Sequence, residues 1–166
     1  MTDRRIALLL TRPLAQSKGF VNLFEGVSQP SPVHICISPL FEIIFQGPLP
    51  DMSPYRSLIF TSSNGVRAFS QLKPGSILPS FTVGKVTAET AISMGLPAQM
   101  LGLDVQDFTG AILSLKPETP CLHLRGDISR SALATQLSNA GLATDEVIVY
   151  RQRGLPLTEE AQQILL

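Results

Sequence analysis

The stretch SLIFTSSNGVRAFSQL at residues 57–72 has the pattern of a strand, a polar loop and a helix. Its first four residues predict a short strand, and a helical pattern runs from Asn64 to Leu72. The polar residues 61–65 lie between the two. This order is the unit from which parallel sheets with helices on both faces are built.

The same unit repeats through the rest of the chain. The pattern predicts further strands at residues 81–83, 120–124 and 144–150. It predicts helices at 86–94, 105–115 and 129–140, with Asp104 as the N-cap of the second and Gly95 and Gly141 ending the other two. We therefore expect an α/β fold with a mainly parallel sheet.

The beginning of the chain predicts another strand, helix and strand. Residues 5–11 form an apolar run, Pro13 suits the first turn of a helix, and residues 33–37 suit a second strand. These strands have no later partners, and two strands cannot bury a doubly covered sheet. Either the chain is a fragment, or its first elements pack on something unusual.

Two extended segments interrupt the regular pattern. Residues 38–54 contain four prolines, too many for a helix, and residues 151–157 resemble a second connection. After them, Thr158 begins a capping box with acidic residues in its first turn, which predicts a last short helix. We interpret the proline-rich segment as a crossover between two domains.

Composition limits the classes of function. Lys plus Arg equals Asp plus Glu at 13 each, so the chain has no overall basic field for nucleic acid, and an anion site must be local. The apolar run at residues 6–10 is too short to cross a membrane and lacks the cleavage site of a secretory signal. We therefore expect a cytoplasmic protein.

Cysteine and histidine residues show no pattern of a metal site or a disulfide framework. Cys36, Cys121, His34 and His123 lie in strand-like runs, and we expect all four side chains to be packed. The sequence also has no nucleotide-binding glycine fingerprint and no G-x-S-x-G motif. Any chemistry should therefore need neither a metal nor a cofactor, and should depend on electrostatic positioning of a substrate.

Four polar loops follow predicted strands, at residues 11–13, 61–65, 84–87 and 125–127. In a parallel sheet such loops share the carboxyl edge, where helix N-termini favour phosphates and carboxylates. Arg12, Lys85 and Arg125 add positive charges. Ser, Thr, Asn, Asp and Gly also serve as ordinary caps and turns, so a structural interpretation stays open for each loop, and Asp127 fits an N-cap best.

Tyr150 ends a predicted strand just before the second connection. It could be a core-edge or interface residue. It could also present its phenol to a cleft between domains as a neutral hydrogen-bond donor.

Several segments, taken in order and spacing, resemble the uroporphyrinogen-III synthase family. FTSSNGVRAF at residues 60–69 is the longest of them. The shorter ones are TRP at 11–13, PLFEI at 39–43, VGKVTA at 83–88, LRG at 124–126 and VY at 149–150. The resemblance extends from about Leu8 to Arg153.

The resemblance implies two parallel-sheet, flavodoxin- or Rossmann-like domains joined by a two-stranded linker. The first domain would be discontinuous, with residues 1–37 as its first part and 158–166 as the start of its remainder. Residues 38–54 would form the crossover, 55–150 the inserted second domain, and 151–157 the return linker. Family members continue well past this length, so we expect the first domain to be incomplete and the chain to be truncated at its C-terminus, with weak activity or none.

The resemblance also implies an activity. The family closes the linear tetrapyrrole hydroxymethylbilane, which bears eight carboxylates, into a ring; it inverts the last pyrrole through a spiro intermediate and releases water, without a cofactor. A monomer coupled to hydroxymethylbilane synthase is the expected arrangement. The resemblance assigns Tyr150 to help the hydroxyl leave. The residues expected to bind substrate are Thr11, Arg12, Thr61, Ser62, Ser63, Asn64, Lys85, Thr87, Arg125 and Gly126.

Two alternatives stay open at this point. The chain could be a module that binds a tetrapyrrole or another anion without converting it. It could also be an unrelated flavodoxin-like or sugar-binding domain, in which Thr61, Ser62, Ser63 and Tyr150 do not face a common cleft.

Overall fold

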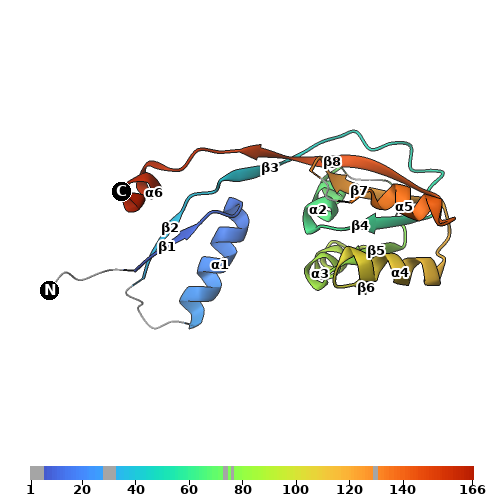
Figure 1. Cartoon of the computed structure of the whole chain (residues 1–166), viewed down its shortest axis with the longest axis horizontal. Coiled ribbons are helices and arrows are strands. Elements are labelled where there is room, and N and C mark those ends of the chain that lie inside the picture. Colours follow the sequence, from blue (N-terminus) through green and yellow to red (C-terminus); the bar gives the residue numbers. More distant parts are fainter. Residues whose placement is uncertain (1–5, 28–32, 73–74, 76, 129–130) are drawn as a thin grey trace. The chain divides into compact units, whose positions relative to one another are not determined.

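The computed structural model describes residues 6–27, 33–72, 75, 77–128 and 131–166, and within them the chain forms two sheets (Figure 1). It divides into two compact units. Unit 1 consists of Met1–Ile43 and Gln152–Leu166, and unit 2 of Ile44–Arg151. The chain passes from one unit to the other at two points, and both lie inside strands: β3 (Phe41–Phe45) and β8 (Thr144–Gly154).

The larger sheet has the strand order β3-β8-β7-β4-β5-β6. Its other strands are β4 (Ser57–Phe60), β5 (Ser80–Val83), β6 (Ala98–Gly102) and β7 (Cys121–Gly126). Strands β4 to β8 pair in parallel. Strand β3 runs opposite to β8, because the amide of Gln46 bonds to Val149 and that of Leu155 bonds to Leu40.

Helices cover both faces of this sheet, as the repeated strand–helix pattern predicts (Figure 1). Helix α2 (Ser63–Gln71) packs against α3 (Lys85–Ser93), and α4 (Val105–Leu115) packs against α5 (Leu133–Asn139). Successive residues of a strand point to opposite faces. Ile59 therefore joins Phe108 and the α4–α5 side of the core, whereas the ring of Phe60 meets that of Phe69 in α2, with ring centroids 5.8 Å apart.

The structure confirms the expected helix ends in unit 2. Asp104 caps α4 by accepting hydrogen bonds from the amides of Gln106 and Asp107, at 2.8 and 2.9 Å. Gly95 and Gly141 follow α3 and α5 with φ angles of +81° and +88°, a region that glycine enters without strain. Cys121 is buried in the core cluster with a free thiol, as predicted.

Unit 2 differs from the sequence predictions at three places. Strand β6 was not predicted; its sequence, AQMLG, lacks β-branched residues. Strand β8 continues beyond Tyr150 to Gly154, because its pairing continues into the expected connection. Helix α5 begins at Leu133 rather than 129, so Asp127 is not its cap and instead accepts a hydrogen bond from the amide of Ile128; residues 129 and 130 lie outside the described residues.

Unit 1 contains the parallel pair β1 (Ile6–Leu10) and β2 (Val33–Ile37), with α1 (Leu14–Val27) and α6 (Glu159–Leu165). Residue 5, expected in the first strand, lies outside the described residues. Thr158 caps α6 by accepting a hydrogen bond from the amide of Ala161, as predicted. Its own amide donates to Ser38 Oγ at 2.9 Å, which holds the last segment beside β2.

The two unit 1 residues expected to be packed differ from each other. Cys36 is 1% exposed and lies in the core as predicted. The prediction for His34 is wrong: half of its side chain is exposed, and its Nε2 lies 2.9 Å from Glu160 Oε1. His34 and Cys36 lie two residues apart in β2 and so point to the same face; the exposed histidine is the one nearer the start of the strand, beside Glu160 of α6. None of the described helices is long and apolar enough to span a membrane.

Candidate functional site at the carboxyl edge of unit 2

The order in which the chain adds strands to the sheet reverses between the neighbours β4 and β7. From β4 it continues outward through β5 to β6, and then it crosses back to β7 and β8 on the other side. In open parallel sheets, ligands bind at such a switch point, outside the carboxyl ends of the strands. Two of the segments predicted as loops flank this point, although residues 63–65 belong to α2, and Arg125 and Gly126 belong to β7, because β7 extends beyond its predicted end at residue 124.

The first turn of α2 lies against the end of β7. Ser62 caps the helix, and its Oγ accepts a hydrogen bond from the amide of Asn64 at 3.1 Å. Gly65 permits the close approach, since a Cβ there would lie 2.8 Å from the carbonyl oxygen of Leu124. The start of α2, with its partial positive charge, is thereby held at the switch point. Thr61, Ser62, Ser63 and Asn64 are all half-buried there.

A buried histidine lies beside Thr61. His123 in β7 is 1% exposed, and its Nε2 is 3.3 Å from Thr61 Oγ1. Burial lowers the pKa of His123 to about 4, with the nearby charge of Arg125 acting in the same direction and that of Glu146 opposing it. The ring is therefore neutral near pH 7. The prediction that His123 is packed is confirmed.

Arg125 is already engaged within the protein. Its Nη2 donates to Glu146 Oε1 at 2.6 Å, and its Nη1 donates to the carbonyl of Gly126 at 2.8 Å. The side chain is 19% exposed. The hydrogen bond from Arg125 is the main cause that lowers the pKa of Glu146. The cation expected to bind substrate thus has its charge offset by a carboxylate of β8.

The ring of Tyr150 packs against the backbone of Gly126. The two residues are register partners in β7 and β8, after an irregularity between Arg125 and Gly126. A Cβ at Gly126 would lie 2.5 Å from Cε2 of the Tyr150 ring, so a larger residue there would push the phenol out of its present position. Tyr150 is 8% exposed, and its carbonyl accepts a hydrogen bond from the amide of Asp127 at 3.0 Å. The phenol therefore lies against the carboxyl end of β7, one of the two strands that flank the switch point.

The loop after β5 contributes one accessible cation. Gly84 precedes α3 with a φ of +76°, and the amide of Gly84 bonds to Gly102 of β6 at 2.8 Å. Lys85 is exposed, and its Nζ lies 3.7 Å from Glu89 one turn along. Thr87 is 7% exposed and faces the interior. Of the two residues expected to bind here, Lys85 is the more accessible.

Thr11 and Arg12 lie in unit 1, between β1 and α1. The carbonyl of Thr11 accepts a hydrogen bond from the amide of Leu40 at 3.0 Å. The carbonyl of Arg12 accepts one from the buried hydroxyl of Ser17 at 3.0 Å, and the Arg12 side chain is exposed. Both residues occupy a strand-to-helix turn, as the sequence predicts.

Sequence reasoning missed two members of this site, His123 and Glu146. Both belong to the strand face that also carries Arg125, since side chains two residues apart in β7 point the same way and Glu146 is the register partner of His123. The period of two along LHLRG was the available signal for His123. Glu146 could be found only with the β7–β8 register.

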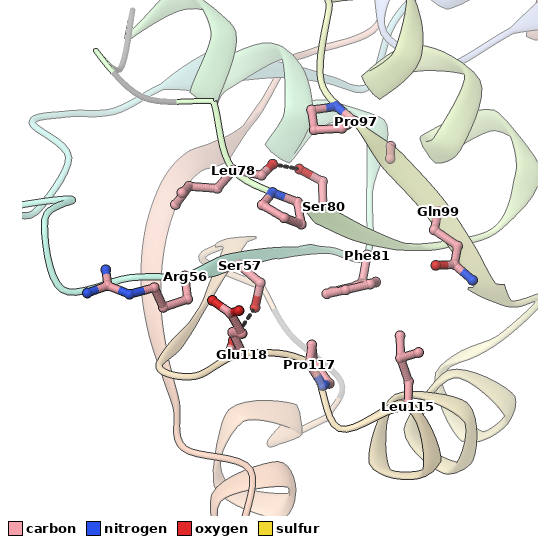
Figure 2. Close-up of a pocket in the computed structure, with 12 residues that line it drawn as sticks. Arg56, Ser57, Leu78, Ser80, Phe81, Pro97, Gln99, Leu115, Pro117 and Glu118 are labelled. Atoms are coloured by element: carbon pink, nitrogen blue, oxygen red, sulfur yellow. Dashed lines mark hydrogen bonds between the residues drawn. The ribbon is translucent and has the colours of Figure 1, made fainter.

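A hollow lies at the opposite, amino edge of the sheet. It has a volume of about 750 Å³ and is lined by the first residues of three strands, Ser57, Ser80 and Ala98, and by Leu115 at the end of α4. Figure 2 shows the ring of Phe81 within it, while the guanidinium of Arg56 points away. Helix C-termini disfavour anions, so the carboxyl edge remains the better anion site.

A comparison with protein-family models matches residues 32–165 to the uroporphyrinogen-III synthase HemD family. The chain belongs to this family. This rules out the second alternative left open by the sequence, an unrelated flavodoxin-like or sugar-binding domain. A search of curated proteins found no match for this family member.

Solved structures of uroporphyrinogen-III synthases share the fold. The structure of the Helicobacter pylori 26695 synthetase matches with a TM-score of 0.63 and 23% identity, over 84% of this chain and 64% of that chain. A mutant synthase from the extremely thermophilic bacterium Thermus thermophilus matches with a TM-score of 0.54 and 17% identity, over 91% of this chain and 64% of that one. This uroporphyrinogen-III synthase family member therefore spans about 64% of the length of these solved relatives.

Proposed function

We propose that the carboxyl edge of unit 2 binds a linear tetrapyrrole polycarboxylate, and that the protein acts as a uroporphyrinogen-III synthase. In this reaction hydroxymethylbilane is cyclised with inversion of ring D and loss of water. The observation that carries the proposal is the contact of Tyr150 with Gly126 at the carboxyl end of β7, the strand whose Leu124 carbonyl lies against the first turn of α2, in a chain of this family.

The groups at this edge suit a substrate with many carboxylates. Thr61, Ser62 and Ser63 offer hydroxyls, the start of α2 adds partial positive charge, and Lys85 adds an exposed cation. Such donors hold an anion without forming a covalent bond. Catalysis would then consist of orienting the terminal pyrrole and stabilising the charge that develops as water leaves.

Tyr150 is the group proposed to act on the leaving hydroxyl. A neutral phenol can donate a hydrogen bond to that oxygen as its bond to carbon breaks. Gly126 and the β7–β8 register fix the ring, so little orientation remains to be gained when substrate binds.

Incubation of the chain with hydroxymethylbilane tests the proposal. The products are oxidised to porphyrins, and the type III isomer is separated from the isomer that closure without inversion gives. We expect excess type III isomer from the unmodified chain and less from Tyr150→Phe, which keeps the ring and removes the hydroxyl. Absence of type III isomer above the uncatalysed reaction contradicts synthase activity.

Binding without conversion is the second candidate function. The start of α2 and the exposed Lys85 favour it, since they would hold an anion whether or not Tyr150 acts on that anion. Calorimetric titration with uroporphyrin III separates the two functions: binding together with no type III product identifies a tetrapyrrole-binding protein.

A further inference from the structure

His123 is a buried histidine whose ring lies next to Thr61, a residue of the proposed site. It lies in β7 with its Nε2 3.3 Å from Thr61 Oγ1. Among the described residues its Nδ1 has no hydrogen-bond partner, although it is buried. The resemblance to the family assigned no role to this residue, and the following inference rests on the proposed function of Thr61.

The partners of the ring determine which nitrogen carries the proton. A neutral imidazole has one N–H donor and one bare nitrogen acceptor. With the proton on Nδ1, a buried N–H would lack a partner, which is rarer and costlier than an unpartnered acceptor. With the proton on Nε2, that N–H donates to Thr61 Oγ1, and only an acceptor lacks a partner. The geometry therefore favours the Nε2–H form.

The charged neighbours of His123 do not reverse this choice. Glu146 is its register partner on β8, but the Glu146 carboxylate is bonded to Arg125 at 2.6 Å. Arg125, two residues along β7, directs its Nη atoms to Glu146 and to the carbonyl of Gly126. These two side chains are the charges that act on His123, and the pKa of about 4 keeps its ring neutral.

We propose that His123 is a positioning residue that makes the Thr61 hydroxyl a hydrogen-bond donor toward an anionic ligand. A threonine hydroxyl has one hydrogen and two lone pairs. When Nε2–H of His123 occupies a lone pair, the hydroxyl hydrogen is free to point outward. In the opposite tautomer that hydrogen would be used on Nε2, and Thr61 could offer only lone pairs, which repel a carboxylate. The His123 tautomer thus selects carboxylate ligands at Thr61.

The tautomer can be measured on the full chain without any ligand. Long-range ¹H–¹⁵N correlation spectra distinguish Nε2–H, Nδ1–H and imidazolium forms from the two ring nitrogen shifts. His34, the only other histidine, is exposed and serves as the internal reference. We expect a neutral Nε2–H ring for His123 at pH 7. A neutral Nδ1–H ring or an imidazolium overturns the inference.

A double-mutant cycle tests whether His123 acts through Thr61. Uroporphyrin III, a stable octacarboxylate, is titrated calorimetrically into the full chain and its variants. Thr61→Val removes the hydroxyl with little change of shape, and His123→Met fills the ring volume without a donor. We expect each to weaken binding by about tenfold, and the double variant to be no weaker than Thr61→Val alone.

Two conservative variants separate positioning from packing. Thr61→Ser keeps the hydroxyl, and His123→Gln keeps an N–H near the position of Nε2, so both should retain most of the affinity. Equal losses from His123→Met with Thr61 present and with Val in its place overturn the inference while the proposed function stands. If the unmodified chain binds no uroporphyrin, the proposed function fails, and the tautomer alone then decides whether Thr61 is held as a donor.

Discussion

The phenol of Tyr150 and the backbone of Gly126 touch so closely that any side chain at position 126 would force the ring to shift. A Cβ there would lie 2.5 Å from Cε2, 2.6 Å from Cζ and 2.9 Å from the hydroxyl oxygen of Tyr150. Position 126 was expected to bind substrate. Its contact with Tyr150 gives it a second role, which is to hold the proposed reactive hydroxyl in place.

Gly126→Ala should displace the Tyr150 ring and destabilise unit 2 by about 1–3 kcal/mol, because the added methyl overlaps ring atoms. The chain has no Trp, and its two tyrosines, Tyr55 and Tyr150, both lie in unit 2, so tyrosine fluorescence during urea unfolding reports this unit.

Gly110→Ala is the matched control, because a Cβ at this exposed position inside α4 would meet nothing within 4 Å. It should stabilise the unit by about 0.5–1 kcal/mol. Equal stability of the Gly126→Ala variant and the unmodified chain would show that the ring is not confined by Gly126.

The stability of unit 2 should fall as the pH is lowered from 7 to 5. The pKa of His123 is lowered to about 4 in the folded chain, against about 6.5 when unfolded, so only the unfolded chain takes up the proton across this window. The stabilisation is fully present above about pH 6.5 and is lost as the pH falls toward 4, with about 2 kcal/mol lost at pH 5.

Tyrosine-monitored urea unfolding at both pH values measures this loss. His34 lies in unit 1, whose unfolding the tyrosines do not report. The His123→Met variant should show an almost flat stability between pH 7 and 5. If the free energy of unfolding of that variant falls between pH 7 and 5 as much as that of the unmodified chain, His123 is not the group that takes up the proton.

Gly65→Ala should loosen the first turn of α2. The added Cβ would lie 2.8 Å from the carbonyl oxygen of Leu124, and backbone atoms at this point cannot rotate away. We expect a loss of about 1–3 kcal/mol and faster amide hydrogen exchange at Val66. Uroporphyrin III binding should weaken as well, since the helix start moves away from the switch point. An unchanged rate of amide hydrogen exchange at Val66 in this variant would contradict the prediction.

Arg125→Met should raise the pKa of Glu146 toward its ordinary value, because the hydrogen bond from Arg125 is the main cause of the lowered pKa. A lowered carboxyl pKa stabilises the fold above its unfolded value of 4.5, and this contribution is lost as the pH falls below it. Both side chains are partly exposed, so we expect a cost of about 1 kcal/mol at pH 7.

A ¹³C titration of the Glu146 carboxyl measures this shift, with Glu146→Gln as the partner variant. If Arg125 mainly binds substrate rather than Glu146, the Glu146 pKa will not respond to Arg125→Met.

Patterns local in sequence predicted most of unit 2. Asp104 was identified as a cap because an acidic residue precedes an apolar periodic run, and Gly95 and Gly141 because glycine adopts the positive φ that ends a helix. Strand β6 was not predicted, because AQMLG carries no β-branched residue and its pairing with β5 is a tertiary contact.

The candidate site was harder to predict, because its members interact across strands. Thr61 and Arg125 were found from their positions after predicted strands. Their partners His123 and Glu146 come from strand interiors, where the sequence alone indicates only burial. His34 and His123 have similar local sequences, yet one is exposed and the other buried, because only β7 lies in the interior of a covered sheet.

The discontinuity of unit 1 has a consequence for the order in which the protein is made. Synthesis runs from the N-terminus, so all of unit 2 emerges from the ribosome before residue 152 does. The bond from the Thr158 amide to Ser38 joins positions 120 residues apart, and it can form only after residue 158 has been made. Strands β1 and β2 therefore leave the ribosome before unit 2 does, whereas α6, the helix that packs against β2, follows only after all of unit 2 has been made.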